Sequence, residues 1–420
     1  MKIASPKDKN LTQEFEKILR KDWGRLMAAL TKQLNSLQLA EDALQEACIA
    51  AFDKWSQIGL PESPQGWLLR VAHRKALNMI RSEIRSAQRE KSSFSFREIF
   101  AKENSEDIPD ERLRLIFTCC HPALDIKSRV ALTLRVVCGI STFDIAKLFL
   151  DSESTMGQRL SRAKSKITKA RIPFSIPDPS QWYDRMQAVL TTIYLVFTSG
   201  YINKMDSFEP SPSSGSFNTD LCTEAIFLTN ILLNLSPNDP EVEGALALML
   251  LTDSRRKARM NHRGETVPPS EQNRNLWDKH KLERGKEILE IALKRKKIGP
   301  FQIKAAISAC QMADPLPDWQ QILELYTILY TMEPTSIIRL NQAVALSESG
   351  RAIYARKILC ELEQELKNYQ PFYAAKASIL SHLEEWEQSI LAYQKAIDLA
   401  SCQSDRLYLL NQLKFIETKK

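Results

Sequence analysis

The C-terminal part of the sequence repeats with a period of 34 residues. Residues 341–366 align with residues 375–399, and matching positions carry small or apolar side chains, in the pairs Ala343/Ala377, Leu346/Leu380 and Ala355/Ser389. This period is typical of tetratricopeptide repeats, in which hairpins of two helices stack and bury their apolar faces against one another. The recurrence favours a stacked array over an accidental helical bundle.

The second copy has large and small residues where a tetratricopeptide repeat requires them: Tyr373, Ala377, Leu380, Trp386, Tyr393 and Ala396. A weaker third copy precedes both, with Trp319, Tyr326 and a closing Pro334. Arrays of this kind bind or brace protein surfaces, so we expect an α-solenoid that takes a protein partner.

The composition predicts an all-α protein. Only 12 of the 420 residues are Gly, and long stretches are rich in Ala, Leu, Glu, Lys and Gln, which favour helix. No apolar run is long enough to span a membrane, and the first residues lack the apolar segment of a signal peptide, so we expect a cytoplasmic chain with no membrane partner. The eight cysteines show no disulfide framework spacing.

Charge and proline divide the chain into parts. The first 173 residues carry more Lys and Arg than Asp and Glu, whereas the remainder is slightly acidic. Three prolines break the segment 172–180, and helical periodicity is lost near 91–110 and in the polar stretch 207–220. Only the basic first part is therefore expected to meet a polyanion, although a basic solvated surface is the alternative.

A helix-turn-helix unit is predicted over residues 139–171. Ser141 can cap a short helix and Ser152 a longer one, whose apolar stripe would be Met156, Leu160, Ala163 and Ile167. Six basic residues and no acidic residue lie between Arg159 and Arg171, on other faces of the second helix. Such a helix fits a DNA major groove, where some cations neutralise phosphates and the first turns contact bases.

Residues 63–91 predict a second basic helix, with Arg70, Arg74, Arg81 and Arg85 along one face. Trp67 lies where this helix follows a proline-containing loop. An aromatic ring beside a row of cations suits a single strand, because bases stack while phosphates are held. For Trp67 a place in the hydrophobic core is at least as good an interpretation.

An acidic helix is predicted over residues 38–55. Glu41, Asp42, Gln45 and Glu46 cluster near its start, where carboxylates also complement the helix dipole. Because an acidic patch would repel DNA, it is better suited to a basic protein partner.

Taken together, the segments "AEDALQEACIAAFDKW", "WLLRVAHRKALNMIR" and "GISTFDIAKLFLDSESTMGQRLSRAKSKI" resemble regions 2 and 4 of bacterial sigma factors of the extracytoplasmic-function type. The group that is most similar carries a long C-terminal tetratricopeptide-like extension. The resemblance implies four parts: region 2 over 1–91, a linker over 92–109, region 4 over 110–172 and the extension over 181–420.

The resemblance also implies residue roles. Asp42, Gln45 and Glu46 would dock on the clamp helices of core RNA polymerase, and region 4 would lie on its flap. The −10 promoter element would be opened and bound by Trp67, Arg70, Arg74, Asn78, Arg81 and Arg85. The −35 element would be contacted by Glu153, Ser154, Gly157, Gln158, Arg159, Arg162 and Lys166. Many such factors carry Asp in place of Asn78 and a polar residue in place of Gly157.

The run Thr118–Pro122, "TCCHP", raises the possibility of a metal or redox centre. Adjacent side chains on a helix point about 100° apart, whereas zinc and redox sites favour Cys-x-x-Cys spacing. We therefore expect partly buried cysteines in the helix that opens region 4, and no metal or other cofactor.

The sequence predicts a non-enzymatic sigma factor that directs promoter-specific initiation, with an extension that modulates its activity. Two other functions stay open: a stand-alone helix-turn-helix regulator with a peptide- or protein-sensing repeat domain, and a repeat scaffold with an incidentally basic end. No role is predicted for residues 270–277 within the extension.

Overall fold

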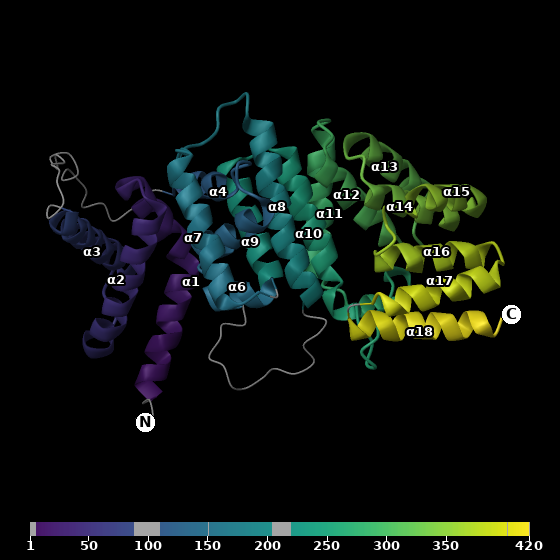
Figure 1. Cartoon of the computed structure of the whole chain (residues 1–420), viewed down its shortest axis with the longest axis horizontal. Coiled ribbons are helices and arrows are strands. Elements are labelled where there is room, and N and C mark those ends of the chain that lie inside the picture. Colours follow the sequence, from purple (N-terminus) through teal and green to yellow (C-terminus); the bar gives the residue numbers. More distant parts are fainter. Residues whose placement is uncertain (1–5, 88–109, 150, 204–219, 401, 420) are drawn as a thin grey trace. The chain divides into compact units, whose positions relative to one another are not determined.

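The computed structural model describes residues 6–87, 110–149, 151–203, 220–400 and 402–419. Within these ranges the regular elements are helices, and the one β-type feature is an isolated bridge between Met260 and Thr266 (Figure 1). The all-α prediction is therefore confirmed. The predicted linker 92–109 lies outside the described residues. By its contacts the chain divides into two compact units, Met1–Val196 and Phe197–Lys420.

Three helices open the first unit: α1 (Pro6–Leu34), α2 (Leu37–Ile58) and α3 (Pro64–Ala87). Ser36 caps α2 by accepting a hydrogen bond from the backbone N–H of Leu39, and Pro64 occupies the first position of α3, where its missing N–H costs nothing. Their shared core contains Leu26, Leu44, Ala47, Trp55, Leu68 and Ala72, all buried. Small alanines on α2 and α3 let the helices pack closely.

The helix-turn-helix region follows as α4 (Arg112–Cys119), α5 (Ile126–Leu132), the π-helical turn η2 (Thr133–Val137), α6 (Thr142–Leu148) and α7 (Glu153–Lys169). Both predicted caps are present, because Ser141 accepts from the N–H of Asp144 and Ser152 from that of Thr155. The predicted apolar stripe of α7 is buried in full: Met156, Leu160, Ala163 and Ile167.

The first unit also includes the N-terminal part of α8 (Trp182–Asn203), which follows the proline-rich break. The indole of Trp182 lies 5.4 Å from the ring of Phe117, between centroids, and the guanidinium of Arg185 donates to the Phe117 carbonyl at 2.8 Å. Met186, Val189, Leu190 and Ile193 are buried. The start of α8 therefore covers the core of the helix-turn-helix region.

The run Thr118–Pro122 begins at the end of α4 and contains two buried cysteines. Cys119 and Cys120 are 0% and 1% exposed, and the Cys120 thiol lies 3.4 Å from the Thr133 hydroxyl. Burial raises the pKa of both thiols, so they stay protonated at neutral pH. The sequence predicts partial burial of these cysteines, whereas the structure buries both completely.

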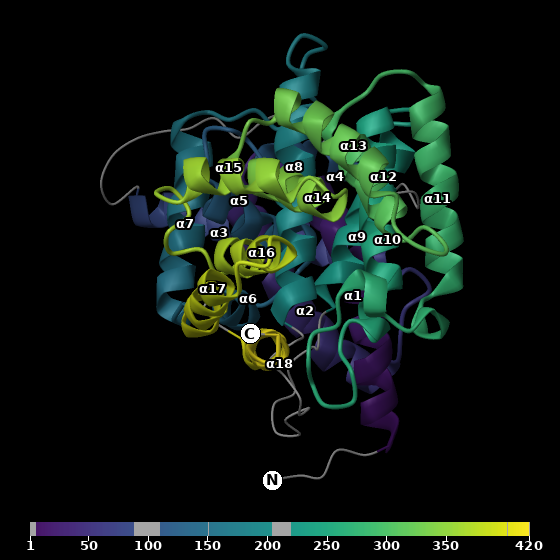
Figure 2. The same cartoon turned by 90° about the vertical axis from the view of Figure 1, so that its right-hand side faces the viewer.

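The second unit contains the end of α8, from Phe197, and the helices α9 (Leu221–Leu235), α10 (Pro240–Ser254), α11 (Lys279–Lys294), α12 (Pro300–Gln311), α13 (Trp319–Met332), α14 (Ser336–Glu348), α15 (Ala352–Leu362), α16 (Gln370–His382), α17 (Trp386–Asp398) and α18 (Gln403–Glu417). Helices α14 and α16 begin 34 positions apart, as do α15 and α17. Figures 1 and 2 show these helices packed as successive hairpins.

The repeated positions form the hairpin cores. Ala343 and Ala355 lie in one apolar cluster with Phe372, and Ala377 lies in the next with Tyr393. Ser389, which replaces the alanine at the second position, is buried and donates to the Ala377 carbonyl at 2.8 Å. The 34-residue sequence repeat therefore corresponds to a structural repeat of helical hairpins.

Candidate nucleic-acid interface

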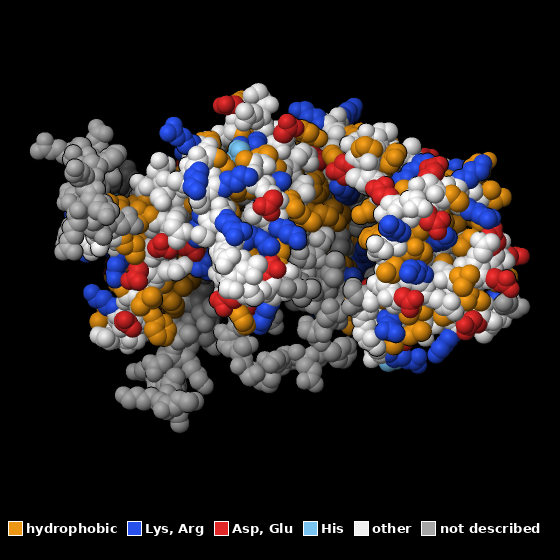
Figure 3. Space-filling view, viewed as in Figure 1, with side chains coloured by type: hydrophobic (Ala, Val, Ile, Leu, Met, Phe, Trp, Pro, Cys, Tyr) orange, Lys and Arg blue, Asp and Glu red, His pale blue; other side chains and the backbone are white. Residues whose placement is uncertain are grey.

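Helix α7 presents a polar and basic surface opposite its apolar stripe. Five of the residues that the sequence assigns to the −35 element are exposed on it: Glu153, Ser154, Gln158, Arg162 and Lys166. A groove of about 540 Å³ along this surface is lined by Ser161, Arg162, Ser165, Lys166 and Lys169. Figure 3 shows Lys and Arg side chains gathered over the region where Figure 1 draws α6 and α7.

The other two predicted residues of this helix are half-buried. Arg159 pairs with Asp151 at 2.6 Å, and its guanidinium carbon lies 5.5 Å from the centroid of the Phe149 ring. This position ties α7 to the turn after α6. Gly157 instead faces a pocket toward α2, and a Cβ added there would meet no atom within 4 Å.

Helix α3 carries the second basic surface. Arg70, Arg74, Asn78 and Arg81 are exposed, whereas the side chain of Arg85 lies outside the described residues. Trp67 is half-buried, and its ring meets that of the buried Trp55 edge-on at 5.3 Å between centroids. Part of the Trp67 side chain therefore packs in the hydrophobic core, and the rest is exposed on the helix that carries the cations.

The three residues of α2 that the sequence assigns to polymerase docking are half-buried and bonded within the first unit. Asp42 accepts from Gln38, Gln45 donates to Glu41, and Glu46 pairs with Lys75 of α3 at 3.2 Å. Two large apolar side chains share this face of the helix: Ile49 is 61% exposed and Phe52 49% exposed. Sequence reasoning missed them, although a period of three to four residues places both in line with Asp42 and Gln45.

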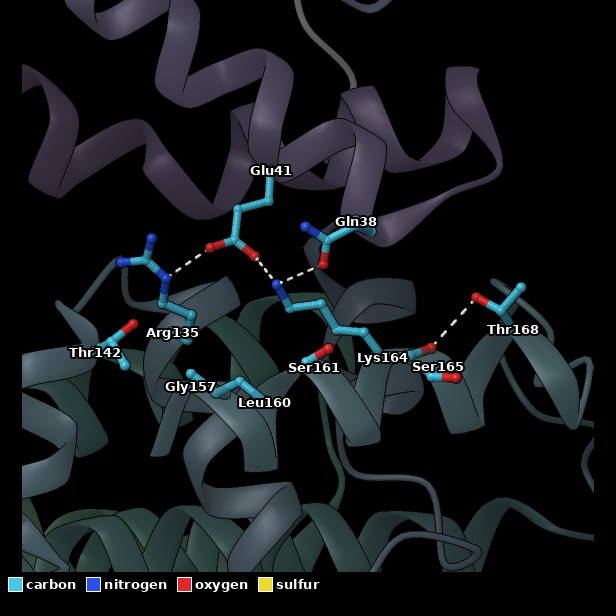
Figure 4. Close-up of a pocket in the computed structure, with 10 residues that line it drawn as sticks. All are labelled: Gln38, Glu41, Arg135, Thr142, Gly157, Leu160, Ser161, Lys164, Ser165 and Thr168. Atoms are coloured by element: carbon cyan, nitrogen blue, oxygen red, sulfur yellow. Dashed lines mark hydrogen bonds and ion pairs between the residues drawn. The ribbon is translucent and has the colours of Figure 1, made fainter. Parts of the chain in front are cut away.

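Glu41 connects α2 to the helix-turn-helix region. Its carboxylate, 4% exposed, accepts from Arg135 Nε at 2.6 Å and from Lys164 Nζ at 2.5 Å (Figure 4). Lys164 also donates to Gln38 at 2.9 Å. These residues border a pocket of about 390 Å³ between α2 and α7. Removing one of the two cations would leave the buried carboxylate only partly compensated, which would destabilise the folded first unit.

The π-helical turn η2 helps to form this contact. The extra residue of a π turn shifts the side chains that follow it, and such turns are frequent at functional sites. Arg135 lies within η2, donates from Nη1 to the Ile140 carbonyl at 3.1 Å and so directs its Nε toward Glu41.

Helix α1 packs against the same turn. The Trp23 indole donates to the Val136 carbonyl at 3.2 Å, and Lys32 pairs with Glu111 at 2.6 Å. Two glycines allow the close approach: a Cβ on Gly24 would lie 2.6 Å from the Val137 carbonyl oxygen, and one on Gly139, at φ 73°, would lie 2.8 Å from Trp23. The three N-terminal helices and the helix-turn-helix region are thus packed together.

In the part of the chain that the structure describes, no group of three or more His, Cys, Asp or Glu side chains is placed to hold a metal ion. None of the described helices combines the length and the apolar character that crossing a membrane requires.

Comparison with known proteins agrees with this arrangement. The family model of sigma-70 region 2 matches residues 21–86, which include α2 and most of α3, and the model of sigma-70 region 4 matches residues 114–167, which include α7 nearly to its end. A family of unknown function, DUF6596, matches residues 185–293.

The chain also resembles whole proteins. An uncharacterized protein of Rhizobium meliloti (strain 1021) is 35% identical over 396 residues, which is 92% of each chain. The crystal structure of yeast Tom70 covers 98% of this chain and 85% of its own, but at a TM-score of 0.37 and 14% identity it supports no conclusion. A factor with sigma-70 regions 2 and 4 binds core RNA polymerase and promoter DNA and directs transcription initiation. On these two matches and the relative that covers 92% of the chain, the chain belongs to the sigma-70 family, as a factor of the extracytoplasmic-function type with a long C-terminal extension.

Proposed function

We propose that the exposed face of α2 is the surface that docks on the clamp helices of core polymerase. The face joins the half-buried polar side chains of Asp42, Gln45 and Glu46 to the exposed apolar side chains of Ile49 and Phe52. Exposed apolar side chains that share a helix face with carboxylates suit a protein partner better than DNA, because the apolar groups gain from burial and the charges repel phosphates. This combination is the observation that carries the assignment.

We further propose that α3 binds the −10 element. Its exposed cations, Arg70, Arg74 and Arg81, would hold the phosphates of an opened strand, and the solvent-facing part of Trp67 would stack on a base. Asn78, exposed on the same helix, can both donate and accept hydrogen bonds to a base edge. Arg85 of the same helix is a further proposed contact.

Helix α7 is the proposed reader of the −35 element, on the flap side of polymerase. Gln158 and Arg162 are exposed one turn apart, and both carry N–H donors for hydrogen bonds to acceptor atoms on base edges. Glu153 and Ser154 lie at the start of the helix, where contacts to bases are also expected. Lys166 would neutralise a phosphate. Arg159 would act mainly by holding α7 on the preceding turn, since Asp151 already occupies it.

The proposed domains are region 2 over residues 1–91, a linker over 92–109, region 4 over 110–172 and the extension over 181–420. In the free chain Glu41 pairs with Lys164 of α7. We propose that docking of region 2 on polymerase breaks this pair and so releases α7. The helical hairpins of the extension would modulate this activity, and a protein partner is the class of ligand that stacked hairpins suit.

The experiment is co-elution of the full chain with purified core polymerase in size-exclusion chromatography. We expect the wild type to co-elute and the double variant Asp42→Ala/Glu46→Ala to bind at least about 10-fold more weakly, which corresponds to about 1.4 kcal/mol. Lys54→Ala, an exposed change on another face of α2, is the matched control. A stand-alone regulator would instead bind duplex DNA equally well with and without polymerase.

A further inference from the structure

The segment between α10 and α11 belongs to the part of the chain that matches a family of unknown function. It is closed at its base by a hydrogen bond from the Asp278 N–H to the Ser254 carbonyl at 2.9 Å, and across its middle by one from the Val267 N–H to the Arg259 carbonyl at 2.8 Å. The segment is therefore an ordered element of the second unit.

Its start is the basic run Arg255–Arg259, in which the arginines differ sharply in their partners. Arg256 is held by two carboxylates, those of Asp220 and Asp253. Arg255 is only 7% exposed, and its guanidinium has no hydrogen bond or ion pair with any described residue; its Nε is buried without a partner. Buried charges in proteins are normally paired, because burying a charge alone costs several kcal/mol.

A second unpaired cation lies beside it. The guanidinium of Arg259 lies 4.2 Å above the ring of Tyr201, and its Nη1 donates to the Tyr201 carbonyl at 3.0 Å, but no described carboxylate neutralises it. Burial is the largest effect on the pKa of Arg255 and lowers it; Tyr201 partly opposes this shift, and the charge of Arg259 lowers the pKa again. An arginine cannot escape this cost by losing its proton at neutral pH.

We propose that Arg255 and Arg259, beside Tyr201 at the end of α8, form a binding site for a small ligand that carries a phosphate group. Two guanidiniums supply two positive charges and a fork of N–H donors, which match the charge and the oxygens of a phosphate dianion. The ligand would supply the counter-charge that the described residues lack. Free phosphate and a phosphate monoester share this chemistry.

Hydrogen–deuterium exchange of the full chain tests the site, in inorganic phosphate against chloride at equal pH and ionic strength. We expect amides of residues 254–278 to exchange about 10-fold more slowly when phosphate is ten times above its Kd, since binding suppresses local opening. Glycerol 2-phosphate as a second probe shows whether an ester is accepted. Phosphate that binds to the basic helices α3 and α7 would protect other peptides, which do not overlap residues 254–278, so the two effects are measured separately.

Variants assign the effect to the two arginines. Arg255→Gln and Arg259→Gln should each abolish the phosphate-dependent protection; Arg259 is half-buried, so its replacement is the milder change. Lys257→Gln, which removes an exposed cation of the same run, should retain the protection. Equal exchange of the wild type in phosphate and chloride would overturn the proposal. So would phosphate-dependent protection that survives at its wild-type size in both arginine variants.

Discussion

Glu41 and Lys164 are separated by 123 positions in the sequence, yet Glu41 Oε2 and Lys164 Nζ lie 2.5 Å apart. One residue lies on the helix proposed to dock on polymerase and the other on the helix proposed to contact DNA. The ion pair is 4% and 11% exposed on its two sides, so solvent screens it little. The pair therefore links these two helices in the free chain.

A double-mutant cycle measures this coupling. We expect Glu41→Gln and Lys164→Gln each to destabilise the first unit, and the double variant to lose less than the sum, with a coupling free energy of about 1–3 kcal/mol. Urea unfolding followed by tryptophan fluorescence gives the values. Additive losses would show that the contact is not formed in solution.

Breaking the same contact should also change DNA binding. Glu41→Gln removes the charge that holds Lys164, so we expect the polymerase-free chain to bind duplex DNA about 3–10-fold more tightly. Fluorescence anisotropy at a fixed salt concentration measures it, and Glu62→Gln, an exposed carboxylate of the loop before α3, is the charge-matched control. A gain in the control as large as in Glu41→Gln would contradict the release of α7.

Arg159 and Arg162 should behave differently although both lie on α7. Arg162→Ala should weaken promoter binding by the holoenzyme about 10-fold, because an exposed cation is lost. The slope of the logarithm of the binding constant against the logarithm of the salt concentration should become shallower by about one unit. Arg159→Ala should mainly lower the stability of the first unit, by about 0.5–1 kcal/mol, because it breaks the pair with Asp151. Filter binding across a salt series and urea unfolding separate the two; identical behaviour would contradict the assignments.

The start of α8 should be necessary for the fold of the first unit. A chain that ends at Asn203 should unfold cooperatively. A chain that ends at Ser180 should be less stable, because it lacks the buried side chains of Met186, Leu190 and Ile193, whose burial contributes about 1.5–3 kcal/mol each to the free energy of unfolding. Circular dichroism during heating compares the two chains. Equal stability would mean that α8 does not cover Phe117 in solution.

Thiol reactivity tests the interpretation of the cysteine pair. Burial raises the pKa of Cys119 and Cys120 and raises that of Cys48 to about 12, so at pH 8 these thiols lack the thiolate form that alkylating reagents require. We expect the exposed Cys360 to react at least about 10-fold faster in the native chain, measured by mass spectrometry, and all four to react alike in urea. Fast labelling of Cys119 or Cys120 would contradict their place in the core.

Local chemistry explains which features could be predicted from the sequence. Ser141 and Ser152 act through hydrogen bonds to residues three positions away, and the stripe from Met156 to Ile167 follows the helical period, so both are visible in a short window. The 34-residue repeat is equally direct, because each hairpin packs mainly on its neighbours in sequence.

Features that depend on distant contacts could not be predicted in this way. The sequence places Glu41 in the acidic start of a helix but contains no signal that Arg135 and Lys164 meet it, because that pairing depends on how α1 packs against η2. The prolines of residues 172–180 suggest a boundary, yet Trp182 folds back onto Phe117. Likewise, Arg255 and Arg256 are adjacent and chemically identical, and only the fold gives carboxylate partners to one of them.

The most direct measurement is run-off transcription with purified core polymerase and fragmented genomic DNA. We expect the full chain to direct initiation at a discrete set of start sites that share two upstream elements, and Asp42→Ala/Glu46→Ala to reduce the output at those sites at least about 10-fold while Lys54→Ala leaves it unchanged. Transcripts that start at the same positions without the chain, or undiminished output from the double variant, would contradict the docking of α2 on polymerase.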